Sequence, residues 1–335
     1  MQANAAQRLI QHYVDNFRHL PWRSPPGSAP PEPYRVWLSE VMLQQTTVAA
    51  VTPRFERFVA RWPTTEALAT ALDEDILSEW AGLGYYARAR NLIACAREVA
   101  ARGGFPETEE ELRKLPGVGA YTAAAIAAIA FGKRAIVVDT NVARVVARLN
   151  ALDRLVRSSA ARLHALTDRL TPATGAGEFA QAMMDLGATI CRPRQPLCGK
   201  CPLQPDCAAF ASGDPERFPP TPEKRARPVR HGTAWWTERD GCVWLVRRPT
   251  RGMLGGMPAL PGGEWDADAP PVGEPITLVR FDFTHFRLFL SVVKCATPTG
   301  EGWWQPIGTF AEAGLPTLYV RAIEQVIGGR SRLAA

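Results

Sequence analysis

The sequence lacks any apolar run long enough to cross a membrane. A transmembrane helix needs about 20 consecutive apolar residues, and the longest apolar runs here are far shorter. The first residues, MQANAAQRLIQHYVDNF, are amphipathic and do not combine a charged start with an apolar block, so no signal peptide is predicted. Both absences favour a cytoplasmic protein without a membrane partner.

The first 190 residues also lack the alternating pattern of β-strands. Apolar residues recur there at helical spacing in many short segments, and the Pro-rich stretch 21–33 can only be a loop. We expect helices over 1–20, 34–51, 54–61, 65–71, 74–81, 86–102, 109–114, 120–131, 141–150, 159–171 and 177–189. Pro53 is expected to interrupt the helical pattern between the second and third of these.

The composition changes after Phe210. Residues 213–230 are rich in proline and charge, which is typical of a linker. Short β-branched or aromatic segments bounded by Gly, Pro and Asp then predict strands. The expected strands are 233–239, 242–248, 276–283 and 287–295, and a helix follows over 318–327.

A chain of 335 residues with 46% hydrophobic residues is large enough for two or three domains with real cores. No internal repeat is visible. The patterns predict a mainly α protein with an all-α domain over 1–212, a linker over 213–230 and a smaller α+β domain over 231–335.

The chain has only a modest excess of positive charge. Its net charge of +6 allows nucleic acid as a partner without proving it. Between residues 191 and 230, eight Lys and Arg stand against four Asp and Glu. The basic surplus therefore gathers around a group of cysteines and the segment behind it.

Cysteine is scarce outside that group. Four of the seven cysteines follow the spacing Cys-x6-Cys-x2-Cys-x5-Cys, namely Cys191, Cys198, Cys201 and Cys207. In a reducing compartment this favours a metal site over disulfides. Four thiolates in the loop 191–207 suit a tetrahedral zinc or a cubane iron–sulfur cluster, and the spacing leaves both open. The single C-x-x-C pair leans towards iron–sulfur.

A Gly-rich turn, LPGVG, begins the segment 115–139. Gly117 and Gly119 permit backbone angles that side chains forbid, so amides at the following helix start can face a phosphate. Alternatively, the same residues could form a glycine turn that only joins two core helices. In either case Asp139 is the expected N-cap of the next helix, where hydrogen bonds from amides would keep it ionised.

Glu40 lies among apolar residues in VWLSEVMLQQTTV. It either faces solvent from a helix surface or lies in a partly apolar cleft, where desolvation would raise its pKa and suit it to general acid catalysis. Gln44 and Gln45, one turn later, can hydrogen-bond base edges. A protonated Glu40 and an ionised Asp139 would form the pair that glycosidic cleavage requires.

These motifs resemble those of helix–hairpin–helix DNA glycosylases that carry an iron–sulfur cluster, and more closely those of the MutY family of adenine DNA glycosylases. The matching segments are LPWR (20–23), SEVMLQQT (39–46), GLGYYARARNL (82–92), LPGVGAYTA (115–123), VDTNV (138–142), FAQAMMDLGATIC (179–191) and FTHF (283–286). The resemblance covers nearly all of the residues from about 7 to 330. It implies a [4Fe–4S] cluster on the four cysteines and a monomeric enzyme acting on DNA.

The resemblance implies that the enzyme removes adenine mispaired with 8-oxoguanine or guanine in duplex DNA, after flipping the base. Glu40 would protonate the adenine at N7, Asp139 would stabilise the oxocarbenium-like sugar electrostatically or through a transient adduct, and Asn141 would orient the carboxylates and water. Endonuclease III-type relatives have a catalytic Lys where this chain has Tyr121, which cannot form a Schiff base. A monofunctional glycosylase follows. Without the resemblance, Tyr121 is a core tyrosine and Asn141 a first-turn helix residue.

The resemblance also implies contacts to the lesion. Tyr85 would wedge beside the oxidised guanine, although the pattern alone suits a packed aromatic. Thr284 stands where the family usually has Ser, and His285 would sense the lesion unless it is only a turn histidine. The other expected DNA contacts are Gln45, Thr46, Leu83, Gly117 and Gly119.

The second domain lacks the acidic cluster of a Nudix hydrolase. Residues 255–263 resemble the start of a Nudix fold, but no REUxEE helix follows, so the domain resembles the lesion-recognition domain of the MutY family instead. Two other functions stay open. An endonuclease III-like lyase is disfavoured by Tyr121, and a redox-sensing DNA-binding module without catalysis is disfavoured by the presence of Glu40 and Asp139.

Overall fold

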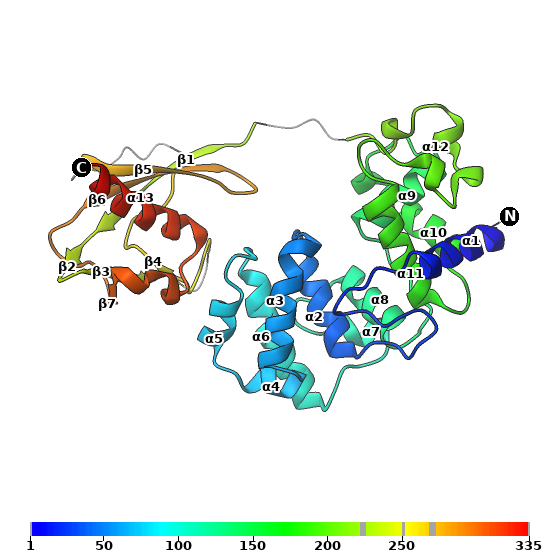
Figure 1. Ribbon diagram of the computed structural model, residues 1–335, viewed down its shortest axis with the longest axis horizontal. Coiled ribbons are helices and arrows are strands. Elements are labelled where there is room, and N and C mark those ends of the chain that lie inside the picture. Colours follow the sequence, from blue (N-terminus) through cyan, green and yellow to red (C-terminus); the bar gives the residue numbers. More distant parts are fainter. Residues whose placement is uncertain (1, 222–225, 250–251, 268–272, 334–335) are drawn as a thin grey trace. The chain divides into compact units, whose positions relative to one another are not determined.

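The computed structural model describes residues 2–221, 226–249, 252–267 and 273–333. The chain forms two compact units, Met1–Ala71 with Asn91–Glu223 and Leu72–Arg90 with Lys224–Ala335. The first is helical and the second contains the β-strands (Figure 1), which confirms a mainly α domain followed by a smaller α+β domain. Among the described residues, no helix has the length and apolar character that a membrane span needs.

The helical unit contains most of the expected helices. They are α1 (Gln2–Asp15), α2 (Pro33–Leu43), α3 (Val48–Arg61), α4 (Thr65–Thr70), α6 (Ala87–Arg102), of which Asn91 onward belongs to this unit, α7 (Glu109–Leu112), α8 (Ala120–Ile129), α9 (Thr140–Leu149), α10 (Ala160–Leu170) and α11 (Ala176–Asp185). The short helix α12 (Ala208–Ala211) was not expected. A π-helical turn, Leu186–Ile190, extends α11 towards the cysteines.

The break that was expected at Pro53 is wrong. The helix α2 ends at Leu43, and α3 runs through Pro53 from Val48 onward. The side chain of Thr47 caps α3 by accepting a hydrogen bond from the amide of Ala50 at 3.3 Å. A capping threonine is a strong start signal, and a proline in the second turn removes only one intrahelical hydrogen bond.

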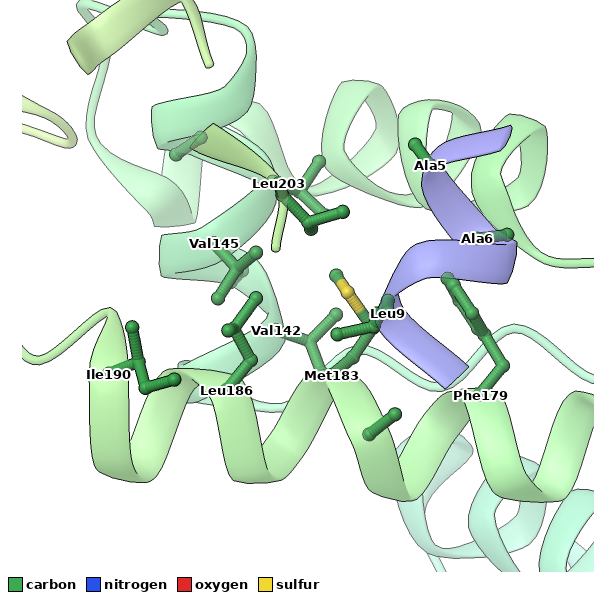
Figure 2. Close-up of a cluster of buried hydrophobic side chains, with 14 of the residues drawn as sticks. Ala5, Ala6, Leu9, Val142, Val145, Phe179, Met183, Leu186, Ile190 and Leu203 are labelled. Atoms are coloured by element: carbon green, nitrogen blue, oxygen red, sulfur yellow. The ribbon is translucent and has the colours of Figure 1, made fainter. Parts of the chain in front are cut away.

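The helices α1, α9 and α11 share one apolar core. Figure 2 shows Leu9 of α1, Val142 of α9 and Met183 of α11 directed into the same cluster. Leu203, from the cysteine loop, joins it. This core holds the N-terminus of α9, where Asp139 lies, firmly against the rest of the unit, because buried apolar contacts resist displacement.

The helix α8 is buried along most of its length, from Thr122 to Ile129. Its alanines let α2, α7 and α11 approach closely. At one crossing, a Cβ atom on Gly177 of α11 would lie 2.4 Å from the carbonyl oxygen of Ala128. The tight packing places Glu40 of α2 beside Tyr121 of α8.

The described residues of the second unit form two sheets. In the first, β1 (Val229–Trp236) runs parallel to β6 (Arg287–Lys294), which pairs antiparallel with β5 (Pro275–Asp282). The second sheet contains β2 (Glu238–Arg239), β3 (Cys242–Arg247), β4 (Pro258–Ala259) and β7 (Gly302–Pro306). The helix α13 (Thr317–Leu333) packs against β5.

The expected strands are confirmed to within a few residues, except that the first begins earlier and is divided between β1 and β2. The sequence patterns missed β4 and β7. A two-residue strand has no readable alternation, and β7 begins with Gly302 and ends with Pro306, which are turn signals in a sequence.

The division of the chain differs from the expected boundaries in two places. The segment Leu72–Arg90, which contains α5 (Asp73–Glu79), groups with the C-terminal strands. The first part of the expected linker belongs to the helical unit, because the Phe218 side chain is buried and its carbonyl accepts a 2.9 Å hydrogen bond from Arg148 Nε. The high content of proline and charged residues in this segment gave no sign that Phe218 is buried.

Candidate active site

The helical unit contains a cavity of about 1040 Å³. The cavity is lined by several of the residues that sequence patterns nominated, from α2, α8, the start of α9 and the loop after α2. These residues are Glu40, Gln45, Thr46, Tyr121, Asp139 and Asn141. The fold therefore brings together all of the expected catalytic residues, which lie up to about a hundred positions apart in the chain.

Glu40 is buried, with 7% of its surface exposed. The alternative of a solvent-facing helix residue is therefore wrong. Burial raises the pKa of Glu40 to about 7, while a 2.6 Å hydrogen bond from Tyr121 Oη to Oε2 lowers it and the charge of Asp139 raises it. A carboxyl with that pKa is about half protonated at neutral pH and can act as an acid.

Asp139 is the N-cap of α9, as expected. Its Oδ1 accepts a hydrogen bond from the amide of Val142 at 2.6 Å, and its Oδ2 accepts one from Asn141 Nδ2 at 2.9 Å. These bonds lower the pKa of Asp139, but burial is the larger effect and raises it above the ordinary value. The expected hydrogen bonds are present, and the ionised state of Asp139 stays a prediction. The opposing effect of burial could not be read from the sequence, because local capping says nothing about desolvation.

The cavity wall also carries an ion-pair cluster that the sequence patterns did not reveal. Asp185 accepts hydrogen bonds from Arg23 at 2.6 and 3.0 Å and from Arg18 at 2.8 Å. The side chains of Arg23 and Asp185 are only 8% and 12% exposed. All three residues line the cavity. Arg23 and Asp185 lie in the LPWR and FAQAMMDLGATIC segments, and membership in these family-like segments was the only sequence signal that marked them.

Arg144 links Asn141 to the cysteine loop. Its Nη2 donates to Asn141 Oδ1 at 2.9 Å and to the carbonyl of Gly187 at 2.6 Å, and its Nε donates to the carbonyl of Cys191 at 2.8 Å. The bond to Oδ1 orients the amide of Asn141 so that its Nδ2 faces Asp139. Sequence patterns missed Arg144, because nothing local marks its distant partners.

The four clustered cysteines line one small pocket together with Arg148, and none of them forms a disulfide. Within the described part of the chain, no group of three or more His, Cys, Asp or Glu side chains is set to hold a metal ion. Arg148 is buried, with Nη1 3.4 Å from Cys191 Sγ, and its other bonds go to neutral carbonyls. The fit therefore rests on the chemistry of the donors and not on their present arrangement: four soft donors beside a buried cation suit a thiolate-bound centre, whose negative charge would balance the guanidinium.

The two hairpin glycines differ in what they require. Gly117 has φ +72°, and a Cβ atom there would lie 2.6 Å from the Cβ of Asn91. Gly119 has φ −83° and is the N-cap of α8, without a side-chain cap. Both are exposed, so the first amides of α8 start from an open turn. Their contact with a phosphate stays a prediction.

The expected lesion contacts of the second unit are brought partly together. Tyr85, which is 43% exposed, is hydrogen-bonded through its hydroxyl to Oγ1 of Thr284. Thr284 and His285 are exposed, whereas Leu83 is buried. Phe283 stacks on Phe286 with ring centroids 4.8 Å apart, and this stacking fixes the turn that presents Thr284 and His285.

Two family models match the chain. Residues 38–170 match the HhH-GPD superfamily of base excision DNA repair proteins, and residues 232–325 match the NUDIX domain. The solved structure of a thermostable thymine-DNA glycosylase is similar, with 28% identity and a TM-score of 0.56, over 63% of this chain and 97% of that one. The name of that protein refers to a different base.

Curated relatives narrow the family. The human adenine DNA glycosylase is 37% identical over 311 residues, which are 77% of this chain and 57% of the human protein. The chain thus spans little more than half the length of that relative. The adenine DNA glycosylase of Mycobacterium tuberculosis is 43% identical over 216 residues, which are 63% of this chain and 70% of the mycobacterial protein. Identity at this level over most of a relative means that the chain belongs to the adenine DNA glycosylase family.

Proposed function

We propose that the chain is a monofunctional DNA glycosylase that removes adenine paired with 8-oxoguanine or guanine in duplex DNA. The observation that carries the proposal is the cavity in which Glu40, Tyr121 and Asp139 meet, in a chain of this family. The cavity supplies an acid near pKa 7 and a second, hydrogen-bonded carboxyl. These two groups are what cleavage of an N-glycosidic bond needs.

The substrate base enters the cavity flipped out of the duplex, because its glycosidic bond is unreachable inside the stack. A cavity of about 1040 Å³ accommodates a nucleoside. Arg18, Arg23 and Asp185 offer hydrogen-bond donors and an acceptor along its wall, and a base edge can bind to such groups. The purine N7 must then face Glu40.

In the first chemical step, Glu40 transfers its proton to N7 of adenine. Tyr121 Oη donates to Oε2 of Glu40, so the transferable proton resides on the other oxygen, Oε1. Protonation withdraws electrons from N9, and the C1′–N9 bond breaks with both electrons leaving on the base. Adenine departs as a neutral leaving group, which lowers the barrier of this step.

In the second step, Asp139 stabilises the oxocarbenium-like sugar electrostatically or through a transient covalent bond to C1′. Asn141 keeps the Asp139 carboxylate in place through its 2.9 Å hydrogen bond. Water then adds to C1′ and loses a proton to the Glu40 carboxylate. This returns the acid to its starting state and leaves an abasic site in an intact strand.

The identity of residue 121 argues against a lyase. A phenol has no amine that could condense with the C1′ aldehyde of an abasic site. An endonuclease III-like lyase would need another amine in this cavity, and the cavity lining contains no lysine among the described residues. Trapping with borohydride, which reduces Schiff bases, should therefore leave protein and DNA unlinked.

The remaining expected residues complete the proposed complex. Gly117 and Gly119 bind backbone phosphate at the start of α8, and Cys191, Cys198, Cys201 and Cys207 hold a [4Fe–4S] cluster. The cluster, when bound, supplies a rigid cross-link between the ends of the loop 191–207. Lesion contacts come from Gln45, Thr46, Leu83, Tyr85, Thr284 and His285. The chain acts on duplex DNA as a monomer.

The deciding experiment uses a duplex with one adenine opposite 8-oxoguanine. The purified protein should create abasic sites that break only after alkali or heat. Strand breaks before that treatment would favour the lyase, and a duplex that stays resistant to alkali would refute the glycosylase. A parallel duplex with adenine opposite guanine measures the relative preference, and one with adenine opposite thymine is the control.

A further inference from the structure

Tyr85 has an unusual backbone conformation for an exposed aromatic residue. Its φ is +49°, in the left-handed region, and its side chain is 43% exposed. Residues other than glycine rarely adopt this region, because the Cβ atom crowds the backbone. Neighbouring structure must hold such a residue in place, and strain of this kind gathers at functional positions.

Arg88 supplies much of that restraint. Its Nη2 donates to the carbonyl of Leu83 at 2.9 Å and to that of Gly84 at 3.4 Å. Its backbone amide donates to the carbonyl of Tyr85 at 2.8 Å. Trp80 adds a bond from its indole Nε1 to the carbonyl of Gly84 at 3.0 Å. The peptide groups on both sides of Tyr85 are therefore anchored.

The same guanidinium also contacts the Tyr85 ring itself. Arg88 Cζ lies 5.5 Å from the ring centroid of Tyr85 and 5.4 Å from that of the buried Trp80. Cations at such distances are attracted to aromatic faces, more strongly where water is partly excluded. Burial lowers the pKa of Arg88 to about 10, so the group is still a cation at neutral pH.

We propose that Arg88 is a positioning residue that holds Tyr85 in its exposed, left-handed conformation before DNA binds. The proposal rests on the proposed function, in which Tyr85 wedges beside the damaged pair. The Tyr85 ring is rigid only if its backbone and one face are held, and Arg88 does both. A wedge formed in advance avoids the loss in affinity that results when only part of the population is competent to bind.

The test compares Arg88→Met, which keeps side-chain volume, with Arg88→Lys, which keeps the charge but loses the planar guanidinium with its several N–H donors. Arg102→Met is the matched control, because Arg102 lies on the same helix and, within the part of the chain that the structure describes, bonds only to exposed carboxylates. Each protein is titrated against a duplex carrying an uncleavable adenine analogue opposite 8-oxoguanine. A 2-aminopurine next to the lesion reports unstacking through its fluorescence.

Arg88→Met should weaken binding about tenfold, the factor expected when one molecule in ten is competent, and should reduce the fluorescence rise at saturation. Excision at saturating DNA in a single turnover should change less than binding. Arg88→Lys should fall between Arg88→Met and the wild type, and Arg102→Met should match the wild type. Circular dichroism and unfolding temperature check that each variant is folded.

A double-variant cycle distinguishes positioning from a direct phosphate contact. In a Tyr85→Ala background, Arg88→Met should weaken binding no further, because the ring it positions is gone. Additive losses would overturn the proposal, as would wild-type fluorescence from Arg88→Met. Failure of the proposed function looks different, because the wild-type protein would then excise no adenine at all.

Discussion

The hydroxyl of Tyr121 donates a 2.6 Å hydrogen bond to Oε2 of Glu40, across 81 positions of sequence. Tyr121 stands where an amine nucleophile would be needed for Schiff-base chemistry, and it also contacts Glu40, the proposed acid. The hydrogen bond lowers the pKa of Glu40, against a larger rise caused by burial. In the proposed mechanism, this one side chain therefore contributes to two properties of the site, the absence of Schiff-base chemistry and the protonation state of the acid.

Glu40→Gln should abolish excision while binding is kept. Glutamine has nearly the same shape as glutamate but carries no transferable proton, and general acid catalysis contributes about 10²–10⁴-fold. Single-turnover excision should fall at least this far, and a gel-shift titration with the same duplex should change little. Excision at the wild-type rate would rule out Glu40 as the acid.

Tyr121→Phe should move the pH dependence of excision upwards. Loss of the hydrogen bond removes a stabilisation of the Glu40 carboxylate, so its pKa should rise above about 7. A bond to a charged group is worth enough to shift the profile by about one pH unit. The rate at saturating DNA, which requires protonated Glu40, should decline at higher pH in the variant than in the wild type. A decline at lower pH would contradict this pairing.

Glu40→Gln should also stabilise the protein in alkali. The folded-state pKa of about 7 exceeds the ordinary value of 4.5, so stability from this carboxyl is present below about pH 4.5 and lost as pH rises through 7. The full penalty is about 3 kcal/mol, from a shift of that size. In urea at pH 8, the free energy of unfolding should be larger for the variant than for the wild type, and this difference should shrink at pH 5. An equal difference at both pH values would mean that the charge is not the cause.

Gly117→Ala should destabilise the hairpin, whereas Gly119→Ala should not. A Cβ at residue 117 would meet Asn91 at 2.6 Å with φ at +72°, while the space beside Gly119 is open. Backbone strain of this kind costs about 1–3 kcal/mol. The thermal unfolding temperature should fall by several degrees for Gly117→Ala only. DNA binding measured well below both transitions then tests whether the turn contacts phosphate.

Cys201→Ser should prevent the cluster from assembling. The wild-type protein should contain about four iron and four sulfide per chain and absorb visible light. The variant should lose both and unfold at a lower temperature, because the loop 191–207 loses its cross-link. Cys242→Ser, at the start of β3 and outside the pocket, is the control and should keep its iron. Zinc without visible absorbance in the wild-type protein would overturn the iron–sulfur assignment.

Local features could be predicted well. The helices follow from apolar spacing, and the N-cap at Asp139 follows from a side chain that needs only an amide three residues on. Pro53 was misjudged, because the capping bond of Thr47 decided where α3 starts. The strands β4 and β7 were missed, because their pairing partners and not their own residues define them.

Long-range pairs could not be predicted. Arg23 and Asp185 form a bidentate ion pair across 162 positions, and Arg144 reaches 47 positions to the carbonyl of Cys191. No local spacing connects such residues, since only the packing of distant helices brings them together. They became visible as parts of one cavity wall and one hydrogen-bond chain only once the fold was known.

The sequence by itself determined the glycine turn before α8, the cap on α9, the cysteine spacing and the absence of a lysine at residue 121. Each depends on residues close together in the chain or on the identity of a single residue. Only the tertiary structure decided that Glu40 is buried, that Tyr121 binds it, and that burial raises the pKa values of both Glu40 and Asp139. The reason is physical, because desolvation is set by atoms that come from everywhere else in the fold.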